Sequence, residues 1–199
     1  MQKPRIILIN GAPGIGKSTV GLELAYQLGI KQIVDVDVIR EVLRGQFSPD
    51  EKPYLHKSSC SAWKVTGEET KENIIASFLK YCEALKPSIE RILNRADVLG
   101  KDMILEGVHL VPSMYAKYLE DNRTDHFLIY GEECEAHKNN FYSRESEFNG
   151  RSVQRFLNQF DNMRLINDYL QEDARLNNST IISNTGLEET IKKIREVVL

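Results

Sequence analysis

A glycine-rich segment near the start of the chain carries the clearest chemical signal. Residues 11–18 read GAPGIGKS and match the pattern G-x-x-x-x-G-K-[ST] in full. Glycines let such a segment curl, so that successive backbone N–H groups point inward at phosphate oxygens. The competing interpretation is a turn that binds nothing, but a predicted strand precedes the segment and a predicted helix follows it. We therefore predict nucleotide contacts from these residues of the loop: Gly11, Gly14, Ile15, Gly16, Lys17, Ser18 and Thr19.

Two side chains of this loop predict the form of the nucleotide. Lys17 would reach the β- and γ-phosphates, and the hydroxyl of Ser18 would coordinate Mg²⁺. The expected cofactors are therefore ATP and Mg²⁺. GTPase switches, motors and regulatory ATPases use the same loop, but the chain has no N-K-x-D segment for reading a guanine base.

Three carboxylates are predicted near the phosphates. Asp35 and Asp37 stand at the end of the predicted strand 32–36, and Glu106 ends the predicted strand 103–106. Ligands of open α/β sheets gather beyond the carboxyl ends of the strands, and alternation along a strand would point Asp35 and Asp37 the same way.

We assign these carboxylates two kinds of role. Asp37 or Glu106 would orient and deprotonate the acceptor hydroxyl, and the choice between them stays open. Ser18, Asp35 and Glu106 would form the Mg²⁺ site, directly or through water. The structural alternative for Asp37 is a cap on a helix that begins at Val38.

Polar and basic residues follow on the acceptor side. Arg40 and Arg44 are one helical turn apart and could clamp a carboxylate or phosphate, or could form a solvated basic face. Dense hydrogen-bond donors follow in the segment HKSS, which begins at His56. His109 is either a ligand, an acid–base group or an ordinary buried histidine. The predicted acceptor-binding set is Asp37, Arg40, His56, Lys57, Ser58 and His109.

Arginines after the fourth predicted strand indicate a lid over residues 137–155. Arg144 and Arg151 are predicted to be catalytic and Arg155 to bind the nucleotide, because phosphoryl transfer needs positive charge that closes over the phosphates. The alternative is a charged helix surface, since Glu145 and Glu147 are neighbours.

The elements that must position these residues alternate along the chain. Continuous apolar runs without alternation predict strands buried on both faces of a parallel sheet, at 5–10, 32–36, 103–106, 126–130 and 180–183. Helical periodicity predicts helices over 17–28, 68–99, 152–174 and 186–198, with a kink or restart at Pro87. The predicted fold is the three-layer P-loop NTPase fold, nucleoside monophosphate kinase-like, with a five-stranded parallel sheet between helices.

Composition narrows the class of protein. The 199 residues suit one α/β domain spanning 1–199, and 41% hydrophobic residues suffice for a core. A formal net charge of -3 disfavours nucleic acid and membrane partners. The three cysteines form no C-x-x-C pair, and no apolar run approaches the roughly 20 residues of a spanning helix. We expect a cytoplasmic protein; a homo-oligomer stays open.

Four segments carry a more specific resemblance: NGAPGIGKST, DVDVIREVLR, LHKSSCSAWK and ILEGVHLVP. With HKNNFYSRE, which matches more loosely, they resemble a small archaeal group of P-loop kinases typified by 2-phosphoglycerate kinase. The resemblance covers most of the chain. It implies nucleotide contacts from Gly14, Gly16, Lys17, Ser18 and Thr19, and acceptor contacts from Asp37, Arg40, His56, Lys57 and Ser58.

A related branch of that group is similar to mevalonate 3-phosphate 5-kinase, which makes mevalonate 3,5-bisphosphate for archaeal isoprenoid synthesis. Typical members of the group carry an N-terminal regulatory module, and the first strand begins here at residue 5, which favours the mevalonate branch. The expected function is ATP-dependent phosphorylation of a small phosphorylated hydroxy acid. The alternatives are a 2-phosphoglycerate kinase making 2,3-bisphosphoglycerate, a nucleotide kinase, a nucleic-acid end kinase and a regulatory ATPase.

Overall fold

A parallel sheet of five strands forms the centre of the structure. The computed structural model of the chain describes residues 4–120, 124–147 and 153–199, with side chains left out for 144–147. The strands pair in the order β2-β3-β1-β4-β5, and every pairing is parallel. Their bounds are β1 Ile6–Asn10, β2 Ile33–Asp35, β3 Met103–Glu106, β4 Thr124–Tyr130 and β5 Thr180–Ser183.

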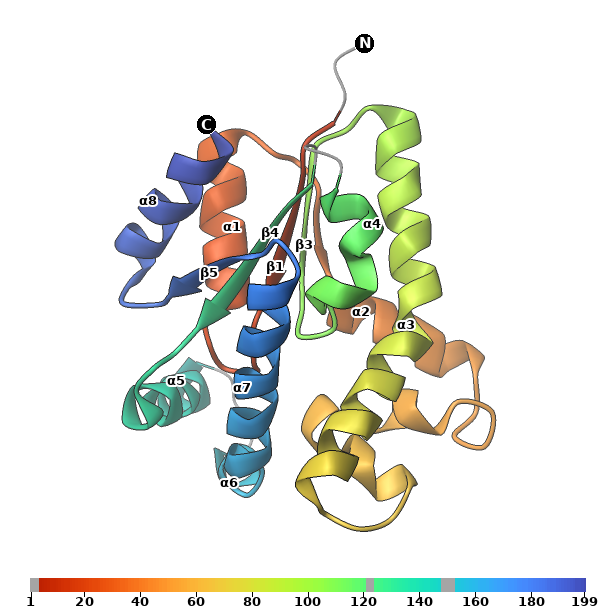
Figure 1. Cartoon of the computed structure of the whole chain (residues 1–199). Helices are drawn as coiled ribbons and strands as arrows, with labels where there is room; N and C mark the ends of the chain where they lie inside the picture. Colours follow the sequence, from red (N-terminus) through yellow and green to blue (C-terminus); the bar gives the residue numbers. More distant parts are fainter. Residues whose placement is uncertain (1–3, 121–123, 148–152) are drawn as a thin grey trace.

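Helices cover both faces of this sheet (Figure 1). One face carries α1 (Lys17–Leu28) and α8 (Leu187–Val198), and the other carries α3 (Lys71–Leu99), α4 (Ala116–Leu119) and α7 (Phe160–Leu176). The remaining helices are α2 (Val36–Gln46), α5 (Cys134–Glu147) and α6 (Val153–Leu157), with short 3₁₀ segments η1 (Pro53–His56), η2 (Ser59–Val65) and η3 (Pro112–Tyr115). The predicted three-layer arrangement is confirmed.

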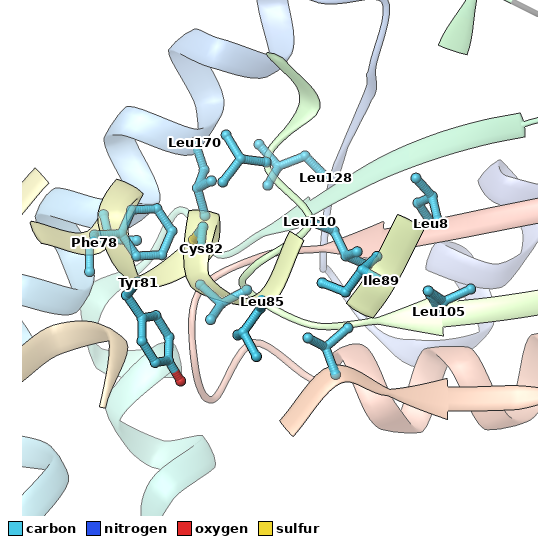
Figure 2. Packing of buried hydrophobic residues seen from close by; sticks show 14 of the residues in the cluster. Leu8, Phe78, Tyr81, Cys82, Leu85, Ile89, Leu105, Leu110, Leu128 and Leu170 are labelled. Carbon is cyan, nitrogen blue, oxygen red and sulfur yellow. The ribbon is translucent and has the colours of Figure 1, made fainter. Parts of the chain in front are cut away.

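The first strand shows how one sequence serves both layers. Ile7 and Ile9 are buried against α1 and α8, whereas Ile6 and Leu8 belong to the core under α3 and α7. Successive strand residues point to opposite faces, so a strand covered on both faces must be apolar throughout. Figure 2 shows the larger of these two cores, in which Leu8 and Leu105 of the sheet meet Leu85 and Ile89 of α3.

The structure corrects the prediction for residues 32–36. The strand ends at Asp35, and the Asp35 carboxylate accepts a hydrogen bond from the N–H of Asp37 at 2.7 Å. Asp35 is therefore the N-cap of α2, and Asp37 lies in the first helical turn. The expectation that both carboxylates alternate along one strand was wrong, as was capping by Asp37.

Two helices also differ from expectation. The predicted helix 152–174 is divided into α6 and α7, because the turn at Asn158 and Gln159 interrupts it. Pro87 lies inside α3 without restarting it, although the two halves of α3 run in different directions in Figure 1. Proline removes one helical hydrogen bond and crowds the preceding turn, which bends a helix that packing holds together.

Several of the segments that could bind ligands gather at one end of the sheet. Figure 1 shows α2, α5 and α6 beyond the carboxyl ends of the strands, whereas the C-terminal end of α8 lies at the opposite end. Across residues 4–120, 124–147 and 153–199, no helix is long and apolar enough to cross a membrane.

Candidate active site

The loop between β1 and α1 has the backbone that its glycines predict. Gly14 and Gly16 have φ values of 83° and 93°, which side chains rarely adopt. A Cβ on Gly11 would lie 2.3 Å from the carbonyl oxygen of Ile129, and one on Gly14 would lie 2.4 Å from the ring of Phe141. The loop therefore curls between β4 and α5 with no room for larger residues.

Side chains from distant elements hold the carbonyl groups of this loop. His137 Nε2 lies 2.7 Å from the Pro13 carbonyl, and Asn140 donates to the Gly14 carbonyl at 2.9 Å. Asn184 donates to the Ile15 carbonyl at 2.7 Å. Carbonyl oxygens repel phosphate, and these three are already paired with side-chain groups, which leaves the backbone N–H groups of the loop to bind an anion.

Lys17, Ser18 and Glu106 meet where α1 begins and β3 ends. The Ser18 hydroxyl donates a hydrogen bond to Glu106 Oε1 at 2.6 Å, and the Lys17 ammonium donates to the Ala12 carbonyl at 3.0 Å. Glu106 is 4% exposed. Burial raises the pKa of the Glu106 carboxyl, while the charge of Lys17 and the Ser18 hydrogen bond lower it.

Asp35 lies beside Glu106 on the neighbouring strand, because the β2–β3 register pairs these two residues. Burial raises the pKa of Asp35, and the hydrogen bond from the Asp37 N–H opposes that rise. The carboxylates of Asp35 and Glu106 and the hydroxyl of Ser18 are a suitable ligand set for Mg²⁺. This ion prefers oxygen ligands and usually keeps several water molecules and phosphate oxygens in its coordination sphere. Such a site needs few protein ligands, consistent with the finding that no group of three His, Cys, Asp or Glu side chains among the described residues could hold a metal.

Asp37 is placed by a chain of contacts that leads from the exposed cleft into the core. Arg40 forms an ion pair with Asp37 at 3.0 Å and donates a hydrogen bond to the Tyr81 hydroxyl at 2.9 Å. The Tyr81 ring packs against His109, with 4.8 Å between ring centroids. Burial lowers the pKa of His109 to about 3, so its imidazole is neutral at neutral pH.

His109 therefore does not take the position predicted for it. Its side chain is 1% exposed, and neither ring nitrogen has a hydrogen-bond partner within the described residues. It lies behind Tyr81 and does not line the cleft. Direct contact with an acceptor was the wrong interpretation, because the chain after β3 turns inward beyond Val108.

One cleft of about 810 Å³ joins several of the other predicted groups. The loop contributes Gly14, Lys17 and Ser18, and the strand ends contribute Asp35 and Glu106. Its acceptor side and its far wall are formed by the residues Asp37, Val38, Arg40, Glu41, Arg44, Ser58, Ser59, Cys60, Arg155, Phe156, Gln159 and Met163. Phosphate-binding, carboxylate and cationic groups therefore line the same cleft.

A smaller pocket of about 300 Å³ opens beside the acceptor end of this cleft. Five residues line both cavities: Arg40, Arg44, Ser58, Arg155 and Gln159. The pocket alone is lined by His56, Lys57, Ser61 and Lys64. His56 Nε2 lies 2.8 Å from the Phe47 carbonyl, so this ring is also tied to the chain around it.

The predicted lid lies only partly within the described residues. Arg155, on α6, lines the cleft, and its contact with the nucleotide stays a prediction. The side chain of Arg144 and all of Arg151 lie outside the described part of the chain. Arg164 donates to the carbonyls of Gly131 and Glu132 at 2.6 and 3.2 Å, and so fixes the chain after β4.

The acceptor side is connected by hydrogen bonds to the start of α7. Ser58 donates to Gln159 Oε1 at 3.2 Å, and Asn162 donates to the Cys60 carbonyl at 3.3 Å. The Ser58 hydroxyl also forms a capping box with Ser61 at the start of η2. These bonds join η2 to the start of α7 across about 100 residues of sequence.

Sequence reasoning missed Gln159 and Tyr81. Gln159 follows no motif, and it reaches the cleft only because the helix breaks there. Tyr81 falls on the apolar stripe of α3, where an aromatic residue indicates core. Its position next to Cys82 and one turn before Leu85 gives no sign that its hydroxyl contacts Arg40.

The loop, the sheet order and the carboxylate cluster define a P-loop kinase fold of the nucleoside monophosphate kinase type. Two solved structures show the same fold: a shikimate kinase from Acinetobacter baumannii (TM-score 0.57, 17% identity) and a gluconokinase from Sinorhizobium meliloti (TM-score 0.51, 15% identity). The alignments cover 99% and 97% of this chain, and 93% and 90% of those chains. At this identity the likeness concerns the fold alone.

The chain is similar over nearly its whole length to archaeal proteins named 2-phosphoglycerate kinase. It is 37% identical to the one from Methanocaldococcus jannaschii and 36% identical to those from Methanopyrus kandleri and Pyrococcus horikoshii. The matches include 99%, 97% and 100% of this chain, but 64%, 60% and 65% of those proteins. The chain thus spans less than two thirds of the curated relatives it matches. No family model matches it.

These relatives confirm the resemblance to the 2-phosphoglycerate kinase group. They do not support the predicted preference for the mevalonate 3-phosphate branch, because the relatives carry the name of the alternative.

Proposed function

We propose that this chain transfers the γ-phosphoryl group of Mg-ATP to a hydroxyl of a small phosphorylated hydroxy acid, with 2-phosphoglycerate as the leading acceptor. One observation carries the proposal. A single cleft is lined by the phosphate loop, by the carboxylates of Asp37 and Glu106, and by the cationic Arg40 and Arg44. The names of the archaeal relatives support the choice of acceptor.

The loop would hold the donor. Backbone N–H groups of residues 14–18 and the Lys17 ammonium would bind the β- and γ-phosphates, in the space left by the fixed carbonyl groups. Ser18, Asp35 and Glu106 would hold Mg²⁺, which neutralises charge on the phosphates when bound. Arg155 would add positive charge from the far wall, which lowers the barrier as the γ-phosphoryl leaves.

Asp37 is the better candidate for the acceptor hydroxyl. Its side chain is 56% exposed at the cleft and is oriented by Arg40, whereas Glu106 is buried and already accepts a hydrogen bond from Ser18. The hydroxyl would attack the γ-phosphorus in line, breaking the bond to the β-phosphate oxygen, and its proton would pass to the Asp37 carboxylate. Glu106 then remains with the metal.

ADP formation with Mg-ATP and single acceptors tests this proposal. The panel is 2-phosphoglycerate, mevalonate 3-phosphate, mevalonate, glycerate and nucleoside monophosphates. We expect acceptor-dependent turnover with 2-phosphoglycerate. Turnover with mevalonate 3-phosphate alone would restore the other branch, and turnover with nucleoside monophosphates alone would indicate a nucleotide kinase. ATP hydrolysis that ignores every acceptor would contradict the proposal and favour a regulatory ATPase.

A further inference from the structure

We propose that the 300 Å³ pocket beside the cleft binds the phosphate monoester of the acceptor, as a dianion, and thereby selects phosphorylated acceptors over unphosphorylated ones. The inference rests on the proposed function and assigns the acceptor's phosphate to one place. We call this cavity the cationic pocket; it is lined by Arg40, Arg44, His56, Lys57, Ser58, Ser61, Lys64, Arg155 and Gln159.

The charged side chains that line the cationic pocket are all basic. It is lined by two lysines, three arginines and a histidine, and among the described residues no aspartate or glutamate lines it. The adjoining cleft differs, since four carboxylates line it: Asp35, Asp37, Glu41 and Glu106. The chain as a whole carries a formal charge of -3, so this concentration of positive charge is local. Like charges at close range repel, and a bound dianion would remove that repulsion.

Four of the five lysines and arginines of the pocket fall into two groups, Arg155 being the fifth. Arg40 and Arg44 both bond to Glu41 Oε1, at 2.8 and 2.9 Å, and are thereby held in position on α2. Lys57 and Lys64, by contrast, form no ion pair within the described part of the chain, and Lys64 lies over the Trp63 ring at 5.3 Å. The first group would orient the phosphate and the second would supply uncompensated charge.

Uncharged groups complete the site. The hydroxyls of Ser58 and Ser61 lie 2.7 Å apart at the start of η2, and either can donate to a phosphate oxygen. The Nε2 atom of His56, by contrast, is already occupied by its hydrogen bond to the Phe47 carbonyl. Lys57 is therefore a stronger candidate for a phosphate contact than His56.

The connection between the two cavities explains why a phosphate there would belong to the acceptor. Arg40, Arg44, Ser58, Arg155 and Gln159 line both. Arg40 is bonded to Asp37, the group proposed to receive the hydroxyl proton. An acceptor whose hydroxyl meets Asp37 can therefore reach past Arg40 and place its phosphate in the cationic pocket.

The first test uses the double variant Lys57→Gln, Lys64→Gln. We expect the KM for 2-phosphoglycerate to rise by about tenfold or more, since each charged hydrogen bond contributes roughly a factor of ten. The KM for ATP should stay near its wild-type value. The matched control is Lys31→Gln, Lys101→Gln, two exposed lysines away from both cavities, which should change neither constant. An unchanged acceptor KM in the first variant would overturn the inference.

The second test needs no turnover. The wild-type protein is saturated with Mg-ADP, so that the phosphate loop is filled, and inorganic phosphate is then titrated by calorimetry. We expect a second anion site that the Lys57→Gln, Lys64→Gln variant loses and the control variant keeps. Equal binding by both variants, or no binding by the wild type, would contradict the cationic pocket.

The two tests separate the inference from the proposed function. If no acceptor of the panel is phosphorylated but inorganic phosphate binds as described, the kinase proposal fails and the pocket stands. If glycerate and 2-phosphoglycerate react with the same kcat/KM, the kinase proposal stands and the phosphate subsite is wrong.

Discussion

At the scale of single residues, Glu106 shows a conflict between folding and function. Its carboxylate is buried at the end of β3 beside a second acid, Asp35, and Ser18 and Lys17 offset part of that charge. Burial favours the protonated form, whereas a metal-phosphate site needs the ionised one. The ionised Glu106 side chain, which is the form that would bind Mg-ATP, therefore lowers the stability of the protein without ligand.

Replacing Glu106 by glutamine should separate these effects. Because the pKa of Glu106 is raised in the folded state, the folded protein binds a proton at this carboxyl more tightly than the unfolded chain does. The free energy of unfolding of the wild type therefore rises as the pH falls through that pKa. Glu106→Gln should raise the free energy of unfolding near pH 7 by on the order of 1 kcal/mol and flatten its pH dependence, while kcat falls at least about a hundredfold. Urea melts from about pH 5 to 8 and steady-state kinetics measure both; a destabilised variant would contradict this account.

Tyr81 is a positioning residue in this structure. Its ring is part of the core in Figure 2, with its hydroxyl pointing away from the apolar cluster, and that hydroxyl accepts a hydrogen bond from Arg40. Tyr81→Phe should therefore loosen Arg40 and raise the acceptor KM about threefold to tenfold, leaving the KM for ATP unchanged.

A matched variant controls for the loss of a buried hydroxyl. Tyr115 is also fully buried, and its hydroxyl has no hydrogen-bond partner within the described residues. Tyr115→Phe should leave both KM values unchanged. Equal effects of the two substitutions would mean that Tyr81 acts through general packing and not through Arg40.

At the scale of elements, α5 forms the back wall of the phosphate loop. It supplies the Phe141 ring against Gly14, and His137 and Asn140 bind two loop carbonyls. Gly14→Ala should weaken ATP binding more than about tenfold, because the new methyl group meets Phe141 and φ is 83°. Fluorescent nucleotide titration measures the affinity.

Gly45 provides the control for that substitution. It lies in α2, and a Cβ added there would have no heavy atom within 4 Å, so Gly45→Ala should leave ATP affinity unchanged. Helix propensity predicts that it stabilises the protein by roughly 0.5–1 kcal/mol. If Gly14→Ala binds ATP as the wild type does, the wall formed by α5 does not constrain the loop.

The elements also show what sequence patterns could predict. The strands and the loop were predictable because apolar runs and glycine spacing are local features. Asp35 was misplaced because a three-residue strand passes directly into a helix, and its cap looks like strand alternation. Gln159 and Tyr81 were not predictable, since contacts across the fold, not local pattern, bring them to the cleft.

At the scale of the whole molecule, binding of Mg-ATP should raise the free energy of unfolding of the entire chain. Mg-ATP bound to the folded chain alone, at about a hundred times its Kd, adds about 2.7 kcal/mol. For a chain of this size that corresponds to a rise in Tm of roughly 5–10 °C. Removing Mg²⁺ with EDTA, or substituting Lys17→Ala, should abolish most of the rise. A shift that survives in both cases would place the nucleotide somewhere other than the P-loop.

The three thiols of the chain differ in a way that offers a practical handle. Cys60 and Cys82 are buried, and burial raises the pKa of Cys60 to about 12, so its unreactive thiol form persists even though it borders the cleft. Cys134 is exposed at the first residue of α5. A maleimide dye near neutral pH should therefore attach at this single position without blocking catalysis, and its emission would record any movement of α5 as substrates enter.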